Sequence, residues 1–477
     1  MRSLTALGLA ACLTLVPACA HADPSASSAA SMVDQHQDTT KEIASKLWEW
    51  AEVGYQEEKS TALLQDTLQQ QGFEIEAGVA GIPTAFVAEY GSGGPVIAIL
   101  AEFDALPGIN QDASPERDPI AGKLAGQACG HNLFGAGSVT AALAIKDWLE
   151  TTGTEGTIRV YGTPAEEGGS GKVYMTRAGL FEDVDIALHW HPDDENSASA
   201  NTSLANRSAK FRFYGISAHA AGAPERGRSA LDGAEAFNMM ANMMHEHIPQ
   251  DARMHYVITS GGNAPNVVPD FAEVFYYVRH PDADGVDAIW SRLEKAAEGA
   301  AMGTGTTVDW EIIHGNNPLL VNETLARMMD DKLRAAGGIT YTAEEAAFAE
   351  KIAATFDNPS LTLGSQEDVQ PFNVSLGYGS TDVGDVSWAV PTVGLRTATW
   401  VPGTSAHSWQ AVAASGMSIG HKGAQLAAKT MTMAAIELYQ NDGLIEDAWE
   451  EFEAKRGPDY EYKSLLGDRD PPLDYRK

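Results

Sequence analysis

Two short motifs in the chain carry side chains whose types and spacing suit metal-assisted chemistry. Cys129 and His131 lie two residues apart, and Glu166 is followed directly by Glu167. Thiolate, imidazole and carboxylate groups together suit borderline divalent ions, Zn²⁺ or Mn²⁺, better than Ca²⁺ or Mg²⁺. The glycine between Cys129 and His131 lets the backbone turn, so that both side chains can approach one site.

A pair of metal ions would explain why so many ligand types occur together. Two ions about 3.5–4 Å apart need several ligands, and Cys129, His131, Glu167 and two further histidines would supply them. Such an ion lowers the pKa of bound water from 15.7 to about 7. A carboxylate beside the water can take its proton and return it to a leaving amine. Glu166 and Glu167 could therefore divide the roles of base and ligand.

The N-terminal segment has the features of an export signal. Arg2 gives a positive start, residues 4–16 form an apolar run, and Ala20-His21-Ala22 fits a cleavage site. The run is too short to span a bilayer, which takes about 20 residues. We therefore expect residues 1–22 to be removed and the protein to be exported, periplasmic or secreted. Lipid attachment at Cys19 is the alternative.

Removal of that segment would leave Cys129 as the only cysteine, because Cys12 and Cys19 both lie within it. An exported protein with one cysteine cannot use it for an internal disulfide. Cys129 is then a buried apolar side chain, a nucleophile or a metal ligand. The nearby His131, the acidic pair and the later histidines favour the metal.

The composition limits the kinds of partner. The 477 residues carry 32 Lys and Arg against 65 Asp and Glu, a formal net charge of −33. So acidic a surface argues against nucleic acid or anionic lipid as a partner. No stretch after the N-terminal segment is long and apolar enough to cross a membrane, and the length allows two or three domains.

The candidate residues follow predicted strands of a mostly parallel α/β sheet. A continuous apolar run at 95–100 ends shortly before Asp104, the strand at 157–162 precedes the acidic pair, and the strand at 184–191 ends in His191. The helix expected over 133–149 begins just after His131. Ligands of open α/β sheets bind at the carboxyl ends of the strands. The sequence therefore predicts a polar site at one edge of this sheet.

A smaller domain interrupts this pattern. Its predicted order is strand, helix, strand, strand, helix, strand, which is a compact α+β open sandwich with its own core. The expected elements are Ala209–Ile216, Ser229–His247, Tyr256–Thr259, Glu273–Arg279, Asp284–Gly299 and Thr307–Ile313. We therefore expect a main domain formed by residues 23–204 and 318–456, an insertion at 205–317, and a surface tail at 457–477.

Several ordered motifs together resemble the M20 metallopeptidase and amidohydrolase family, and within it the group of aminobenzoyl-glutamate hydrolase B-type chains. The resemblance covers about residues 40 to 470 and rests on Cys129–Asn132, Thr163–Gly168, Gly215–Ala221, Asn266–Pro269, Arg226–Asp232 and Gly379–Trp388. It implies a zinc-peptidase-like catalytic domain that binds two Zn²⁺ or Mn²⁺ ions, with the insertion serving as lid and dimerisation domain. A homodimer is expected, and a second subunit type is an option.

The resemblance also implies individual roles. Cys129, His131, Glu167, a histidine near position 190 and His407 match the metal ligands of the family, and Glu166 matches its general base. His219 matches the histidine of the inserted domain that reaches a neighbouring subunit's site and helps to hold the substrate or its oxyanion. Asn266 and Arg279 lie where the insertion could contact a substrate carboxylate. Asn132 departs from the pattern, since many relatives have Asp there, but it lies outside the expected ligand set.

Two histidines compete for one ligand position. His189 and His191 point to the same side of a strand because they are two residues apart. By its distance from the acidic pair and from Asp185, the family's ligand falls on His191, which is also nearer the strand end. We therefore prefer His191 and expect His189 to pack on the sheet or to support a ligand.

These residues, together with the resemblance, predict a dinuclear metallo-amidohydrolase that cleaves N-acyl or N-aroyl amino acids, and the resemblance implies p-aminobenzoyl-glutamate as the leading substrate. Metal hydroxide would attack the amide carbonyl, with Glu166 as general base and His219 near the oxyanion. An exported dipeptidase or carboxypeptidase of the same fold is an alternative. Two further alternatives are a cysteine hydrolase with Cys129 as nucleophile and a non-catalytic protein that binds acylated amino acids.

Overall fold

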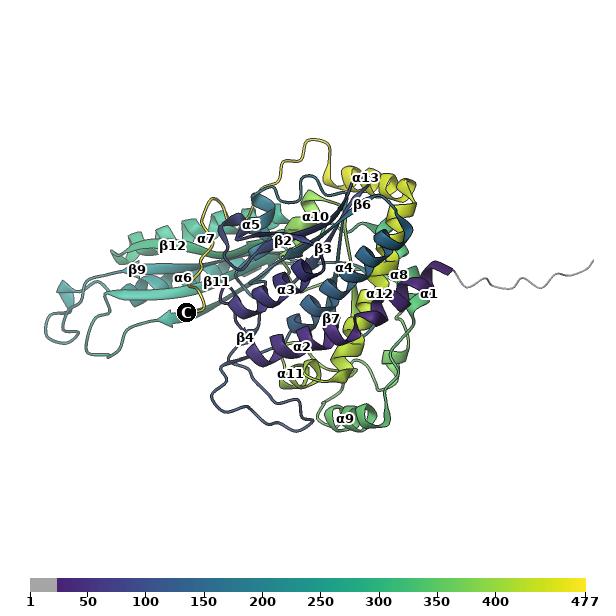
Figure 1. The fold of residues 1–477 in the computed structure, drawn as a ribbon. Helices are drawn as coiled ribbons and strands as arrows, with labels where there is room; N and C mark the ends of the chain where they lie inside the picture. Colours follow the sequence, from purple (N-terminus) through teal and green to yellow (C-terminus); the bar gives the residue numbers. More distant parts are fainter. Residues whose placement is uncertain (1–23) are drawn as a thin grey trace, which may run out of the picture.

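The computed structural model of the protein describes residues 24–477, so the predicted export signal, with Cys12 and Cys19, lies outside the described residues. The described chain forms a compact main domain and a second domain that projects from it (Figure 1). Within residues 24–477, no helix has the length and apolar character needed to cross a membrane.

A six-stranded sheet forms the centre of the main domain. Its strands follow the order β1-β2-β6-β3-β7-β14; the four from β6 to β14 are parallel, and β2 is antiparallel to both of its neighbours, β1 and β6. The strands are β1 Glu74–Ala77, β2 Phe86–Ser92, β3 Val96–Ala101, β6 Gly156–Gly162, β7 Ile186–Asp193 and β14 Thr392–Ala398. The prediction of a mostly parallel α/β sheet is confirmed.

Helices cover both faces of this sheet, which is why its central strands are apolar throughout. In β3, Ile97 and Ile99 pack on the face covered by α4 and α12, while Ala98 and Leu100 join the core beneath α5 and α10. A strand buried on both faces has no polar side, so β3 is a continuous apolar run. The helices of this domain are α1 Pro24–Gln35, α2 Gln37–Trp50, α3 Glu58–Gln70, α4 His131–Thr152, α5 Gly171–Arg177, α8 Glu323–Ala336, α9 Ala343–Ala353, α10 Val383–Ala389, α11 Trp409–Ser415, α12 Ser418–Gln440 and α13 Asp442–Arg456.

The projecting domain is a four-stranded antiparallel sheet with two helices packed against it. The strand order is β10-β11-β9-β12. Its elements are β9 Ala205–Tyr214, α6 Ala230–Met244, β10 Arg253–Ser260, β11 Phe271–His280, α7 Ala283–Thr304 and β12 Thr307–Asn316. Phe211, Phe237, Tyr276 and Trp290 form an aromatic core between sheet and helices. The predicted α+β open sandwich is therefore present.

The chain enters and leaves this domain at one end, because its first and last strands are paired neighbours. Asn206 at the start of β9 lies opposite Asn316 at the end of β12. The two connections to the main domain therefore lie side by side, and the far ends of the strands point away from it (Figure 1). This geometry decides which residues of the insertion can reach the site in their own chain.

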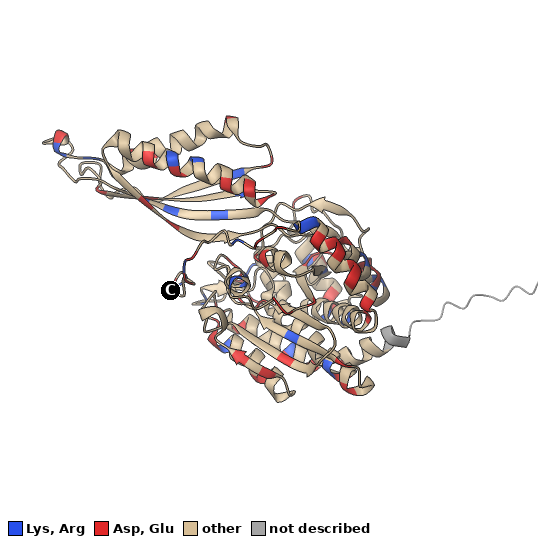
Figure 2. Cartoon of the chain, turned by 90° about the horizontal axis from the view of Figure 1, so that it is seen from above, with Lys and Arg blue, Asp and Glu red and all other residues tan. Residues whose placement is uncertain are grey.

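Acidic side chains are spread over the helices of both domains, with Lys and Arg between them (Figure 2). Their distribution agrees with a solvated acidic surface rather than with a single binding face for a polycation.

Two predictions needed adjustment. Helix α4 begins at His131 itself, so this residue lies in the first turn instead of just before the helix. The tail at 457–477 is more than a surface segment, because Leu465 and Leu466 are buried and Arg476 lines a cavity of the main domain. A surface tail was expected there, and contacts with residues far away in the sequence, such as Arg177 and Arg207, fix it against the two domains.

Candidate metal centre and active site

The predicted site residues gather at the carboxyl edge of the parallel strands. Asp104 follows β3, Glu166 and Glu167 follow β6, and His191 lies near the end of β7. His407 comes from the loop after β14. Parallel strands present all their carboxyl ends at one edge, so four separate segments bring polar side chains to the same place.

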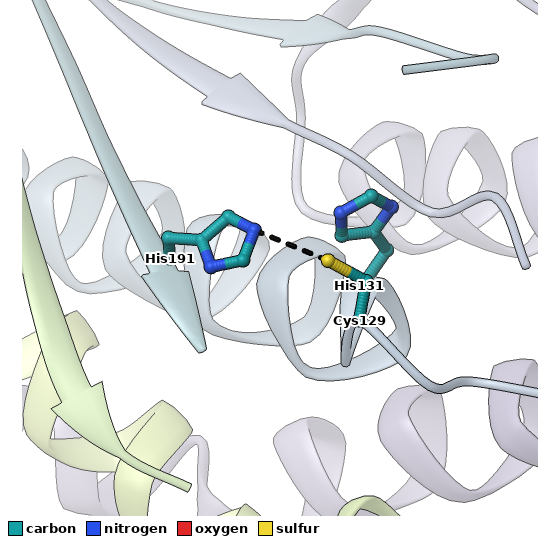
Figure 3. Close-up of side chains that lie close together, drawn as sticks. All are labelled: Cys129, His131 and His191. Atoms are coloured by element: carbon teal, nitrogen blue, oxygen red, sulfur yellow. Dashed lines mark hydrogen bonds between the residues drawn. The ribbon is translucent and has the colours of Figure 1, made fainter. Parts of the chain in front are cut away.

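Cys129, His131 and His191 form the first potential metal-binding group (Figure 3). One ligand atom of each lies within 4.8 Å of the other two, and Cys129 Sγ is 3.5 Å from His191 Nε2. Gly130 makes this approach possible. It has φ +75°, and a Cβ at this position would lie 2.7 Å from Pro192 Cβ. Any other residue would push α4 away from β7.

A second group combines Cys129 with Glu167 and His407. His407 Nε2 lies 3.3 Å from Glu167 Oε1. The His407 backbone has φ +60°, and its N–H donates a hydrogen bond of 2.9 Å to the carbonyl of Ala128. This bond fixes the loop after β14 to the segment that carries Cys129. The thiol thus belongs to two groups, as expected for a centre that holds two neighbouring ions.

Glu102, which the sequence motifs did not single out, completes a third group with His131 and Glu166. It is buried, and its Oε1 accepts a salt bridge of 2.6 Å from Lys172 Nζ. The buried Lys172 also pairs with Asp382 at 2.6 Å. Glu102 stands one residue past β3 and two before Asp104, so alternation along an extended chain could have indicated that both carboxylates face the site.

The donor atoms of these groups fit a metal ion. His131 Nε2 and Glu102 Oε2 lie 3.1 Å apart, and Glu167 Oε1 lies 3.3 Å from His407 Nε2, but none of the three buried atoms makes a hydrogen bond among the described residues. Buried polar atoms are normally satisfied, and an unsatisfied one is costly. Here the three atoms converge with a thiol and imidazoles, which is the donor chemistry of Zn²⁺ or Mn²⁺. Divalent ions would satisfy all of them.

Asp104 orients two of the candidate ligands. Its Oδ1 lies 2.9 Å from His131 Nδ1, and its Oδ2 accepts a hydrogen bond of 2.9 Å from the Glu167 N–H. The first contact leaves Nε2 of His131 as the atom that faces the cluster. A carboxylate behind a metal-binding imidazole fixes its tautomer and its orientation.

Asn132 has a different task from the residues around it. Its side-chain amide donates to the carbonyls of Ala44 and Ser415, both at 3.0 Å. These bonds tie the start of α4 to α2 and to the end of α11. The Asn132 amide is occupied by these two helix contacts, so its departure from the common family residue leaves the cluster intact.

The cluster holds ionisable groups in unusual states. Burial, together with the nearby Glu102 and Glu167, raises the pKa of Glu166 well above its ordinary value. Burial also raises the pKa of the Cys129 thiol, and it lowers the pKa of His191 to about 4. Cys129 belongs to two of the three potential metal groups, which favours the role of a metal ligand over that of the nucleophile of a cysteine hydrolase.

The two competing histidines lie in different surroundings. His189 belongs to none of the three groups, whereas His191 lies beside Cys129 and His131. His189 packs against β14, where a Cβ at Gly394 would lie 2.3 Å from its Nε2. Burial lowers the pKa of His189 to about 3. The geometry favours His191 as the ligand and His189 as a packing residue.

A cavity of about 580 Å³ opens beside the cluster and includes Glu166, Glu167, His191 and His407 in its wall. Arg279, at the end of β11 nearest the main domain, also lines it and donates a hydrogen bond of 3.1 Å to Ser380 Oγ. This volume accommodates a small ligand.

His219 and Asn266 are not brought to this cavity in their own chain. His219 lies beyond the far end of β9 and pairs with Val267, and the Ala220 N–H donates to the Asn266 carbonyl at 3.1 Å. Neither residue is buried. Both Asn266 and Arg279 were expected to lie where the insertion could contact a substrate carboxylate, and the structure places them at opposite ends of the inserted domain, because β11 runs the length of that domain between them.

A catalytic α/β domain with a clustered metal-ligand set and a projecting inserted domain defines a metal-dependent hydrolase. The chain belongs to peptidase family M20/M25/M40, whose family model matches residues 98–371. It is 40% identical to the B chain of the p-aminobenzoyl-glutamate hydrolase of Escherichia coli, over 86% of this chain and 91% of the relative. It is also 29% identical to a Xaa-Arg dipeptidase of Mus musculus, over 90% and 92% of the two chains.

The fold agrees with this assignment. A dinuclear metal-binding M20 peptidase of Bacillus subtilis superposes with a TM-score of 0.58 at 17% identity, covering 85% of this chain and 99% of that one. The predicted family, the fold class and the character of a metal-binding amidohydrolase are thereby confirmed.

Proposed function

We propose that the protein hydrolyses the amide bond of N-acyl or N-aroyl amino acids, p-aminobenzoyl-glutamate among them, with two Zn²⁺ or Mn²⁺ ions. The observation that carries this proposal is the position of the Glu166 carboxyl, which is partly exposed in the cavity wall and has an oxygen within 4.8 Å of donor atoms of Glu102 and His131. The relative that is 40% identical supports the named substrate.

The residues of the chain have distinct tasks in this reaction. Cys129, His131, Glu167, His191 and His407 would hold the ions, and Glu102 is a further candidate. When bound, the ions acidify water and polarise the amide carbonyl. Glu166 takes the proton of the attacking water and delivers it to the leaving nitrogen. A raised pKa makes the Glu166 carboxylate a stronger base for the first step, and the acid that it becomes can protonate the leaving nitrogen in the second.

We further propose that His219 acts in the site of a second copy of the chain. His219 lies far from its own cavity, and the inserted domain that carries it exposes several apolar side chains. Val257 and Ile258 on the edge strand β10, Met239 and Met243 on α6, and Val267 next to His219 are all exposed. An exposed edge strand and an exposed apolar patch favour association, so a homodimer through the inserted domain would cover them.

Mixing two inactive variants tests this sharing of sites. Glu166→Ala and His219→Ala dimers should each be nearly inactive, but mixed dimers contain one intact site built from the unmutated halves. After random subunit exchange about half of the dimers are mixed, and each mixed dimer has one intact site out of two. The expected recovery is therefore about a quarter of wild-type activity. Recovery that requires subunit exchange supports the shared site. Full activity of His219→Ala alone, or no recovery in demonstrated mixed dimers, contradicts it.

The proposed location of the protein rests on its N-terminal segment, which lies outside the described residues. The predicted signal at 1–22 would place the activity in the periplasm or outside the cell, and the lipid alternative at Cys19 stays a prediction. The Escherichia coli relative is one of two chain types that carry the name of the same hydrolase, which supports the option that a second subunit type accompanies this chain.

A dipeptidase is the second candidate, because the chain also resembles a Xaa-Arg dipeptidase. The charge of the cavity speaks against a cationic substrate residue. Arg279 lines the cavity, and its Nε is buried without a hydrogen-bond partner among residues 24–477. A guanidinium in this place would repel an arginine side chain and attract a carboxylate.

A substrate panel separates the two candidates. Metal-loaded protein should release p-aminobenzoate from p-aminobenzoyl-glutamate with a kcat/KM at least about tenfold above that for dipeptides ending in arginine. The reverse order would favour the dipeptidase. Absence of any released product across the whole panel, in protein with measured bound metal, would contradict the proposed function.

A further inference from the structure

The C-terminal tail is an ordered part of the active-site wall. After α13 it crosses both domains, where Arg207 Nε donates to the Leu465 carbonyl at 3.0 Å and Arg177 donates to the carbonyls of Gly467 and Arg469, both at 2.7 Å. Gln56 then donates to the Leu473 carbonyl at 2.8 Å. These contacts guide the last residues of the chain to the cavity.

The end of the tail docks on the turn that carries the acidic pair. The Tyr475 hydroxyl donates to the Glu167 carbonyl at 3.1 Å, and Arg476 Nη2 donates to the same carbonyl at 2.7 Å. Tyr475 packs edge-on against Tyr55, with 5.6 Å between the ring centroids. Gly54 leaves room for it, since a Cβ there would lie 2.2 Å from the Tyr475 hydroxyl oxygen. The docking place is therefore shaped for the tail.

Arg476 brings a positive charge into the cavity without a matching carboxylate. Its side chain lines the cavity, and its Nε is buried with no hydrogen-bond partner among the described residues. Arg396, a third arginine of the wall, differs because it pairs with Asp193. Arg279 resembles Arg476, because its Nε is also buried and without a partner among residues 24–477. Two guanidinium groups in an otherwise acidic protein thus face the ligand space.

We propose that Arg476 is a specificity-determining residue that binds a carboxylate of the substrate, while Arg279 binds another. The C-terminal tail would in this way select amino acids with two carboxylates, such as glutamate, in the leaving position. This inference rests on the proposed function. The chemistry that supports it is the planar guanidinium fork, which matches a carboxylate with paired, charge-assisted hydrogen bonds.

The test compares two variants of neighbouring tail residues on two substrates. Arg476→Gln removes the cavity cation, and Lys477→Gln removes an equal charge from an exposed residue that does not line the cavity. Each is assayed with p-aminobenzoyl-glutamate and p-aminobenzoyl-glutamine, and bound metal is measured in every sample. Arg476→Gln should raise KM for the glutamate conjugate by about 10- to 100-fold with kcat and metal content retained. Lys477→Gln should match wild type.

The glutamine conjugate identifies the carboxylate. If its KM is unchanged by Arg476→Gln, Arg476 binds the side-chain carboxylate; if its KM rises equally, Arg476 binds the α-carboxylate, and either result supports the proposal. An unchanged KM for both conjugates, or a fall in kcat alone, would overturn the proposal. Arg476 would then only stabilise the turn that carries Glu166 and Glu167. Hydrolysis only of N-acyl amino acids with one carboxylate would overturn the inference but keep the proposed function. Metal-loaded wild type that hydrolyses no N-acyl amino acid would overturn both.

Discussion

Glu166→Gln is expected to lower kcat by about 10²–10⁴-fold while the metal ions stay bound. Glutamine keeps the size and the hydrogen-bonding capacity of the side chain, but it can no longer take a proton from water. Glu166 lies beside Glu102 and His131 at the potential metal cluster. The variant therefore removes the group that carries the proton and leaves the proposed ligands Cys129, His131, Glu167, His191 and His407 in place. The measurement is steady-state hydrolysis of p-aminobenzoyl-glutamate with metal analysis of the same sample.

The adjacent residue serves as a contrast. Glu167→Gln should lose both bound metal and activity, because Glu167 Oε1 is buried without a hydrogen bond among the described residues and lies 3.3 Å from His407 Nε2, as expected for a ligand atom. A Glu166→Gln variant with near wild-type turnover would contradict the role of general base. If the wild type also proved inactive with ions bound, the alternative of a non-catalytic binding protein would gain support.

His191→Ala is expected to remove bound metal and to abolish activity, whereas His189→Ala should retain its metal. His191 Nε2 lies 3.5 Å from Cys129 Sγ, and His189 instead packs against Gly394. Losing one ligand weakens a metal site strongly, while a truncated packing histidine leaves a small cavity in the sheet. The two variants delete the same side chain two residues apart on one strand, which makes them a matched pair.

Metal content by elemental analysis and hydrolysis rates decide this comparison, and thermal unfolding checks that both variants are folded. The assignment would be wrong if His189→Ala lost its metal while His191→Ala kept both metal and activity. Loss in both variants, with intact folding, would mean that His189 supports the site through the sheet more strongly than its contacts suggest.

Much of this architecture could be predicted from local sequence, because the motifs that carry the site residues directly follow the predicted strands. The apolar run of β3, the segment after β6 and the end of β7 place Asp104, Glu166 and His191 at one edge. The glycine at position 130 indicated the turn between Cys129 and His131. Such features depend on residues that are close in the sequence, so periodicity and motif spacing are sufficient to find them.

Other parts depend on contacts that no local pattern encodes. Glu102 meets Lys172, and Lys172 meets Asp382, only after the sheet and the two helices α5 and α10 have assembled. The sequence indicated a surface tail, but not that Arg476 reaches the Glu167 carbonyl. Likewise, the sequence does not reveal that the length of β11 separates Asn266 from Arg279, the two candidate substrate-binding residues of the insertion.

The most direct test of the metal-dependent mechanism is hydrolysis of p-aminobenzoyl-glutamate by stripped protein, before and after titration with Zn²⁺ or Mn²⁺. We expect stripping to abolish turnover and activity to return in step with added metal, reaching its plateau at two ions per chain. Turnover that persists unchanged in protein shown to be free of metal would contradict this mechanism and would return Cys129 to consideration as the nucleophile.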